Sequence, residues 1–214
     1  MKTIYQADIF YPEKLRKIYA PPAKLYQLGE NKTIFQMPSI AIIGCRECSG
    51  YGAKVAYQFA YQLAKKGVCI ISGLAKGIDS YAHKGAVAAK GKTIAVLGSG
   101  FSHIYPKENE LLCQQIIQNR GIILTEYEPN IKPQKMHFPA RNRLISGLAD
   151  GILVVEAKQK SGTLITVDFG LEQGKEIFAI PGDINKNTSD GTNDLIKQGA
   201  KLVTNIEDIL EEMK

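Results

Sequence analysis

Residues 68–98, VCIISGLAKGIDSYAHKGAVAAKGKTIAVLG, decide the fold. The segment begins and ends with short, almost continuously apolar runs, 68–73 and 93–98, and each run ends in a glycine. The residues between the two runs, about 79–90, fit a helix. A strand, a helix and a second strand in succession form the unit from which parallel sheets are built.

The same alternation covers most of the chain. Further apolar runs lie at 39–44, 121–127, 151–157, 176–182 and 201–204, and further helices are predicted at about 51–66, 107–119, 139–149, 162–174 and 193–199. Continuous apolar runs are typical of parallel strands that are covered on both faces. We therefore predict an α/β fold, an extended Rossmann-like, doubly wound and mostly parallel sheet of about seven or more strands.

The first 38 residues do not follow this pattern. They contain a short helix-like stretch and a break at Pro21–Pro22. We expect residues 1–38 to form a short N-terminal extension packed on the core, and residues 39–214 to form the Rossmann-like domain.

Composition is ordinary for a soluble globular protein, and the positive net charge is compatible with a polyanionic partner, although many basic proteins bind none. Of the 214 residues, 44% are hydrophobic and 22% are charged, and the net charge is +6. No apolar stretch approaches the ~18 residues of a membrane helix, and the N-terminus lacks the apolar core of a signal peptide. We expect a cytoplasmic protein without a membrane partner. The positive charge is concentrated in residues 130–146, which contain four basic residues and no acidic one.

The cysteines do not predict a metal site. Four cysteines are too few for a disulfide framework. Cys45 and Cys48 form a C-x-x-C, but no second such pair and no nearby pair of histidines completes a zinc site. Cys45 is more simply a replacement for a small residue in a tight turn.

Glycine-rich turns follow the predicted strands. They are GCRECSGYG (44–52), SGLAKGID (72–79), GSGFSHIYP (98–106) and EAKQKSGT (156–163), and each of them leads into a helix. Ligands of open α/β sheets bind beyond the carboxyl ends of the strands, and helix N-termini there favour anions. The Rossmann G-x-G-x-x-G, the P-loop and the PGGxGT of lysine-decarboxylase-like phosphoribohydrolases are all absent, so we predict no cofactor.

The sequence does not contain an obvious catalytic group of residues. His83 lies in a predicted helix, where we expect it to be packed or solvated, and His103 and His137 are placed in loops. Asp79 is most simply an N-cap. Two carboxylates at strand ends, Glu126 and Glu156, could tie loops together. We therefore do not predict an enzyme.

The chain resembles the DNA-processing protein A family (DprA, also called Smf) over roughly residues 11–209. Eight segments in the family's order carry this resemblance: IIGCRECSGYG, IISGLAKGIDSYAHKGAV, TIAVLGSGFSHIYPKEN, ILTEYEP, HFPARNRLISGLADGILVVEA, SGTLIT, FAIPGD and GTNDLIKQGA. The resemblance implies a homodimer that binds single-stranded DNA and helps to load a RecA-type recombinase in natural transformation. It does not extend to the sterile-alpha-motif-like and winged-helix-like domains of longer members.

The resemblance also implies a DNA site. Arg46 stands where the family has a phosphate-contacting arginine, and Lys107 stands where basic residues assist binding. Lys135 and Phe138 match a basic and an aromatic position of the family. The alternative for Lys107 and Lys135 is that each is a solvated lysine. The alternative for Phe138 is a core residue that staples the helix start. The DNA-binding residues predicted in this way are Gly44, Arg46, Gly52, Ser72, Gly73, Lys107, Lys135, Phe138, Arg141, Asn142, Arg143, Ser161, Gly162 and Thr163.

Arg141 and Arg143 immediately precede a buried strand. One interpretation is that they help to form a positive pocket, either by contacting phosphate or by bracing the loops that do. The alternative is that they are solvated residues at a helix start. Two positions apart on a helix, they cannot point in the same direction. We expect one to meet DNA and the other to pair with a carboxylate such as Glu126 or Glu156.

Two alternative functions would use the same carboxyl ends of the strands. One is a nucleotide or phosphoribosyl hydrolase, and the other is a nucleotide-sensing module. The setting could be transformation, repair or defence.

Overall fold

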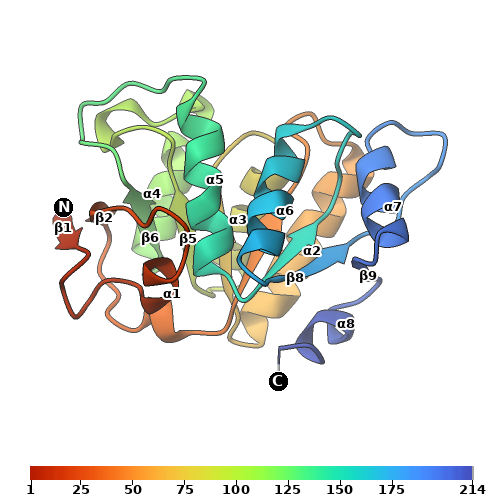
Figure 1. Cartoon of the computed structure of the whole chain (residues 1–214), viewed down its shortest axis with the longest axis horizontal. Helices are drawn as coiled ribbons and strands as arrows, with labels where there is room; N and C mark the ends of the chain where they lie inside the picture. Colours follow the sequence, from red (N-terminus) through yellow and green to blue (C-terminus); the bar gives the residue numbers. More distant parts are fainter. Residues whose placement is uncertain (214) are drawn as a thin grey trace.

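The computed structural model describes residues 1–213 and contains one nine-stranded sheet (Figure 1). Its parallel strands are β3 (Ser39–Ile43), β4 (Cys69–Ser72), β5 (Thr93–Val96), β6 (Ile122–Thr125), β7 (Gly151–Val154), β8 (Glu176–Ala179) and β9 (Lys201–Leu202). Each of them lies within a run that the sequence predicts as a strand. The predicted α/β class and doubly wound sheet are confirmed.

The strand order places a ligand site in the middle of the sheet. The order is β1-β2-β6-β5-β4-β3-β7-β8-β9. From β3 the chain adds β4, β5 and β6 on one side, and then crosses over to add β7, β8 and β9 on the other. The strand order therefore reverses between β3 and β7. Open α/β sheets bind ligands beyond the carboxyl ends of the strands at such a switch point.

Helices cover both faces of the sheet. Figure 1 shows α1 (Glu13–Arg16), α5 (His137–Leu148), α6 (Gly162–Glu172) and α7 (Asp190–Lys197) in front of it. The other face carries α2 (Gly50–Lys65), α3 (Ile78–Ala88), α4 (Glu110–Gln118) and α8 (Glu207–Leu210). Short 3-10 turns lie at η1 (Ile34–Gln36), η2 (Phe101–His103) and η3 (Lys107–Asn109). Among the residues described, no helix is long and apolar enough to cross a membrane.

Side-chain alternation in β3 shows why the strand runs are apolar throughout. Ala41 and Ile43 pack in the core beneath α5 and α6, whereas Ile40 and Ile42 pack beneath α2 and α3. A strand covered on both faces has no position for a solvated side chain.

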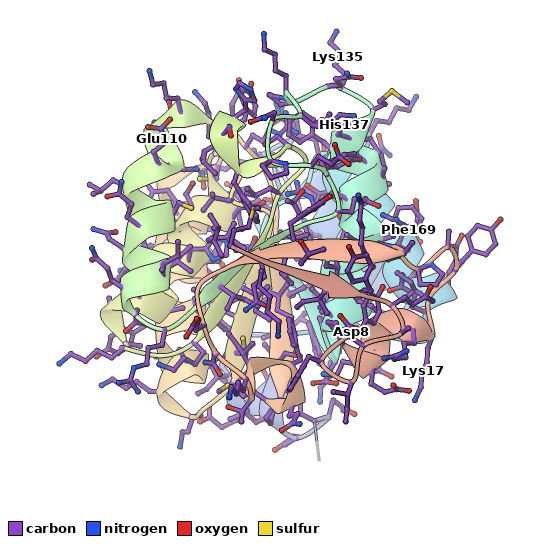
Figure 2. The ribbon with its side chains drawn as sticks, turned by 90° about the vertical axis from the view of Figure 1, so that its left-hand side faces the viewer. Asp8, Lys17, Glu110, Lys135, His137 and Phe169 are labelled. Carbon is purple, nitrogen blue, oxygen red and sulfur yellow. The ribbon has the colours of Figure 1, made fainter. Side chains whose placement is uncertain are left out.

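The N-terminal segment contributes two strands that the sequence analysis did not predict. β1 (Lys2–Tyr5) pairs antiparallel with β2 (Lys24–Leu28), and β2 pairs antiparallel with β6. Figure 2 shows this pair of strands facing the viewer at one edge of the sheet. The sequence of β2 alone does not identify it as a strand, because β2 is held in the sheet by pairing with β6, about one hundred residues further along the chain.

Candidate nucleic-acid interface

A cleft of about 690 Å³ lies at the switch point, beyond the carboxyl ends of β3 and β7. Its walls are the turn after β3, the start of α5, and the turn between β7 and α6. Predicted site residues that line it are Gly44, Arg46, Lys135, Phe138, Arg141, Asn142, Ser161, Gly162 and Thr163. The fold thus brings together residues that lie up to 119 positions apart, from Gly44 to Thr163.

Backbone contacts on two sides hold the turn that carries Arg46. The Cys45 amide donates to the Glu156 carbonyl at 2.9 Å, and the Ile78 amide donates to the Cys45 carbonyl at 3.2 Å. Gly77 has φ of +70°, and a Cβ there would lie 2.3 Å from the Cys45 carbonyl oxygen. Glycine therefore allows the start of α3 to pass beneath the turn. The Arg46 side chain is exposed above this fixed backbone.

Arg46 lies against an aromatic cluster. Its Cζ atom is 5.3 Å from the centre of the Phe138 ring, which is within cation–π range. The Tyr105 ring is 5.6 Å from Phe138 and inclined by 51°. A Cβ at Gly98 would lie 3.1 Å from Phe138 Cδ1. Phe138 therefore packs between Arg46, Tyr105 and Gly98 at the cleft. It is half-exposed there and does not belong to the hydrophobic core.

Glu156 fixes the end of the same turn. The residue is 3% exposed, and its carboxylate accepts hydrogen bonds from the Ser49 amide, at 2.9 Å, and from the Ser49 hydroxyl. The hydroxyl in turn accepts from the Gly52 amide and caps α2. The expectation that Glu156 ties loops together is confirmed.

Gly52 packs against Glu156 and does not line the cleft. It is buried, and a Cβ there would lie 2.4 Å from Glu156 Cδ. Only glycine lets the first turn of α2 approach the Glu156 carboxylate this closely.

Arg141 braces the inner wall of the cleft. The residue is 4% exposed, and Nη1 donates to the carbonyls of Gly73, at 2.8 Å, and Val96. Nε donates to Asn142 Oδ1 at 3.2 Å. Burial lowers the pKa of the guanidinium to about 10, which still leaves it charged at neutral pH, and the nearby Asp79 carboxylate opposes that shift. Arg141 thus supplies both positive charge and mechanical support to the cleft.

Ser72 ends β4, and Gly73 follows it beside Arg141. Ser72 is fully buried and donates its hydroxyl to the Ile42 carbonyl at 2.7 Å, so it cannot reach a ligand. Gly73 lies against Arg141, and a Cβ there would be 2.7 Å from Nη2. At this point the end of β4 meets the buried guanidinium of Arg141, so the two residues support the wall of the cleft.

Asp79 does not cap its own helix, contrary to the simplest interpretation of the sequence. The N-cap of α3 is Gly77. The buried Asp79 carboxylate accepts instead from the amides of Gly73, at 3.1 Å, and Ala75, at 3.3 Å. Burial raises the pKa of this carboxyl, and the charge of Arg141 opposes the rise. Asp79 therefore holds the turn between β4 and α3 in place.

Arg143 is the arginine that pairs with a carboxylate. Its Nη1 and Nη2 donate to the two oxygens of Glu126 at 2.8 and 2.7 Å. This hydrogen bonding raises the pKa of Arg143. This confirms the expectation that one of the two arginines pairs with a carboxylate such as Glu126. Arg143 does not line the cleft and supports the loop after β6, and its role as a DNA contact stays a prediction.

Two predicted lysines differ in position. Lys135 lines the cleft, and Figure 2 shows it on the segment above the sheet, near His137. His137 is the first residue of α5, not a loop residue, and stacks on Tyr127 at 4.1 Å. Lys107 is exposed in η3 and does not line the cleft.

The start of α6 offers unpaired polar groups to the cleft. The Ser161 hydroxyl oxygen is buried and has no hydrogen-bond partner among residues 1–213. A Cβ at Gly162 would meet nothing within 4 Å. The free amides of the first helical turn lie at this end, where the helix dipole is positive. Asn142 lies across from them, 3.4 Å from the Gly162 carbonyl.

Among the lining residues that were not predicted, a lysine and a tyrosine are suited to contact a ligand. Lys158 lies on the turn between β7 and α6, 3.9 Å from the Glu47 carboxylate, and Tyr105 packs on Phe138. The signal for Lys158 was present, since it belongs to the glycine-rich turn EAKQKSGT.

His83 is packed, as expected, and carries an unsatisfied nitrogen. Its Nδ1 lies 2.7 Å from the Thr93 hydroxyl, whereas Nε2 is buried without a partner in the part of the chain that the structure describes. Burial lowers the pKa of His83 to about 3, and the charge of Arg141 acts in the same direction.

The free energy of unfolding is therefore expected to fall in acid. Below a pH of about 6.5, His83 becomes protonated in the unfolded chain but stays neutral in the folded protein. Its contribution to the free energy of unfolding is therefore fully present above that pH and decreases below it. The expected decrease from this residue is about 2 kcal/mol between pH 8 and pH 5. Urea unfolding across this range tests it, with His83→Gln as the comparison. An equally steep pH dependence in that variant would contradict the assignment to His83.

These features define a class of protein, a doubly wound α/β protein with a cationic and aromatic cleft at its switch point. The model of one family, described as DNA recombination-mediator protein A, matches residues 2–214, and the chain belongs to this family.

Known relatives agree in sequence and in structure. The DNA processing protein DprA of Bacillus subtilis is 45% identical over 203 residues, which are 95% of this chain and 68% of that protein. The crystal structure of the Streptococcus pneumoniae protein matches with a TM-score of 0.93 at 44% identity, over 100% of this chain and 74% of that one. A Helicobacter pylori structure, which describes that protein's single-stranded DNA binding mode, matches with a TM-score of 0.88 at 33% identity, over 100% and 96%.

Proposed function

We propose that this chain binds single-stranded DNA in the cleft, with little preference for sequence. The observation that carries the proposal is Arg46. Its guanidinium is exposed on a fixed turn, lies over the Phe138 ring, and makes no ion pair within residues 1–213. A cation that is held in place and not neutralised is suited to a phosphate.

The other lining groups complete a site for a strand. Lys135 and Lys158 add positive charge, and the amides at the start of α6 can receive a phosphate oxygen. Phe138 and Tyr105 offer aromatic surface on which an unpaired base can stack, which is typical of proteins that bind single strands without reading sequence. Arg141 acts here as a positioning residue, because its donors hold the carbonyls of the cleft wall.

The experiment is a salt titration of binding to fluorescent oligo-dT and to the matching duplex. For a probe short enough to occupy the cleft alone, the three exposed lining cations, Arg46, Lys135 and Lys158, predict that the logarithm of the affinity falls with the logarithm of salt concentration, with a slope of about −2. The duplex is expected to bind more weakly, because its bases are not free to stack. Equal and weak binding of both probes, together with hydrolysis of a nucleotide, would instead support an enzyme on the same sheet edge.

Family membership supports the remaining part of the proposal. We infer that the chain acts as a homodimer and without catalysis, and that it helps to load a RecA-type recombinase on the strand that it holds, in recombination such as natural transformation. Light scattering tests the dimer. The rate of RecA filament formation on single-stranded DNA, with and without this protein, tests the loading step, and an unchanged rate would contradict it.

A further inference from the structure

The helices α2 and α3 present a second surface, outside the cleft. We call it the tyrosine–lysine surface. On α2 it follows one face at helical spacing, and α3 adds a tyrosine and a lysine beside it. Its residues are Tyr51, Lys54, Tyr57, Tyr61 and Lys65 on α2, and Tyr81 and Lys84 on α3. All of them are exposed except Tyr61, which is half-buried.

This surface carries positive charge without compensating acid. Across residues 50–66 and 78–90 the only carboxylate is that of Asp79, which is buried beneath the cleft. The same two segments hold five exposed lysines, none of which forms an ion pair within residues 1–213: Lys54, Lys65, Lys66, Lys84 and Lys90. A solvated helix ordinarily carries charges of both signs. A surface with one sign only is suited to a polyanion.

Aromatic rings lie among these lysines. The rings of Tyr57 and Tyr61 are 6.4 Å apart and nearly parallel, at 15°. The Lys65 ammonium lies 5.7 Å from the Tyr61 ring, and the Lys84 ammonium lies 5.0 Å from the Tyr81 ring. Tyr57 and Tyr81 are 37% and 36% exposed, so their rings are open to a ligand. Ring faces next to cations provide both stacking for bases and charge for phosphates.

Close packing joins the two helices into one surface. Gly85 has no side chain, and a Cβ there would lie 2.3 Å from the Tyr57 carbonyl oxygen. The absence of that Cβ lets α3 pack directly on α2, so that Tyr81 and Lys84 lie beside the face that carries Tyr57 and Tyr61.

The surface begins at the rim of the cleft. The turn that carries Arg46 runs directly into α2 through Ser49, and Tyr51 lies in the first turn of that helix. From Tyr51 to Lys65 the helix axis extends about 21 Å, at 1.5 Å per residue. A strand that leaves the cleft past Arg46 therefore meets the tyrosine–lysine surface next.

We propose that the tyrosine–lysine surface binds the continuation of the same single strand whose first part lies in the cleft. The inference rests on the proposed function of the cleft. Continuity with the cleft, the single sign of charge and the exposed rings together favour a single strand over an acidic protein as the occupant.

The experiment compares two lengths of oligo-dT, about 6 and about 20 nucleotides, by fluorescence anisotropy. The triple variant Lys54→Gln, Lys65→Gln, Lys84→Gln is expected to bind the long probe at least ten-fold more weakly. Its salt slope for that probe should become shallower by about 2, because three phosphate contacts are lost. Binding of the short probe should be unchanged. The variant Tyr57→Ala should weaken the long probe about ten-fold, through loss of a stacked base.

A matched control separates local contacts from net charge. The triple variant Lys17→Gln, Lys32→Gln, Lys186→Gln removes the same charge from exposed positions outside both segments, and it should bind both probes like the wild type. Long-probe binding equal to that of the wild type in the first triple variant would overturn the inference, and leave the cleft proposal standing. Binding of polyglutamate that is lost in that same variant would then identify an acidic protein as the occupant. Failure of the wild type to bind even the short probe would instead contradict the proposed function itself.

Discussion

Arg46→Ala is expected to lower the affinity for single-stranded DNA by about 10- to 100-fold while leaving the fold intact. The change removes a cation that no carboxylate neutralises within residues 1–213, and it removes the contact with the Phe138 ring. The turn itself is held by backbone bonds of Cys45 and by Ser49, not by the Arg46 side chain. The free energy of unfolding should therefore change by only about 0.5 kcal/mol or less.

Fluorescence anisotropy with oligo-dT at fixed salt measures the affinity, and urea unfolding measures the stability. Arg120→Ala is the matched control, because Arg120 is an exposed arginine at the end of α4 and lies outside the cleft. Arg46→Lys keeps the charge but loses the planar fork, so its affinity should lie between those of the wild type and Arg46→Ala. Equal losses in Arg46→Ala and Arg120→Ala would mean that only net charge matters, and would contradict a specific role for Arg46.

The sheet could be predicted because its signal is local. Each of the seven parallel strands is a short apolar run, and the strands alternate with segments of helical length. The antiparallel pair of β1 and β2 could not be predicted in the same way. Leu25 and Ile4 are buried only because β2 pairs with β6 and β1 pairs with β2, which are contacts that no local pattern of the segment specifies.

The cleft could be located from the sequence, but the direction of its side chains could not. Glycine-rich turns at the strand ends, and the motifs shared with the family, identified the right loops. Whether a polar residue in such a loop faces the ligand or the protein depends on tertiary partners. Ser72 faces the Ile42 carbonyl and Arg143 faces Glu126, while Arg46 has no such partner among the residues described. Residue type alone does not distinguish these cases.

Arg141→Met is expected to destabilise the protein by about 3–5 kcal/mol, the largest effect on folding that the cleft predicts. The guanidinium is buried, and its removal leaves the carbonyls of Gly73 and Val96 without their donor. It also leaves the buried Asp79 carboxylate without the positive charge that opposes the rise of its pKa. Methionine fills most of the volume, so the loss measures polar interactions more than packing. Urea unfolding of the variant and the wild type gives the difference.

The pH dependence of that difference separates charge from hydrogen bonding. In the variant the pKa of Asp79 rises further, so acid protonates the carboxylate and removes the uncompensated buried charge. The pKa of His83 also rises, because the charge of Arg141 no longer lowers it, and the variant then loses less stability in acid at this residue than the wild type does. Both effects predict that the deficit of Arg141→Met is largest near neutral pH and shrinks as the pH falls toward 5. A deficit that stays constant across this range would place the loss in the two carbonyl hydrogen bonds, and would assign Arg141 a purely mechanical role beneath the cleft.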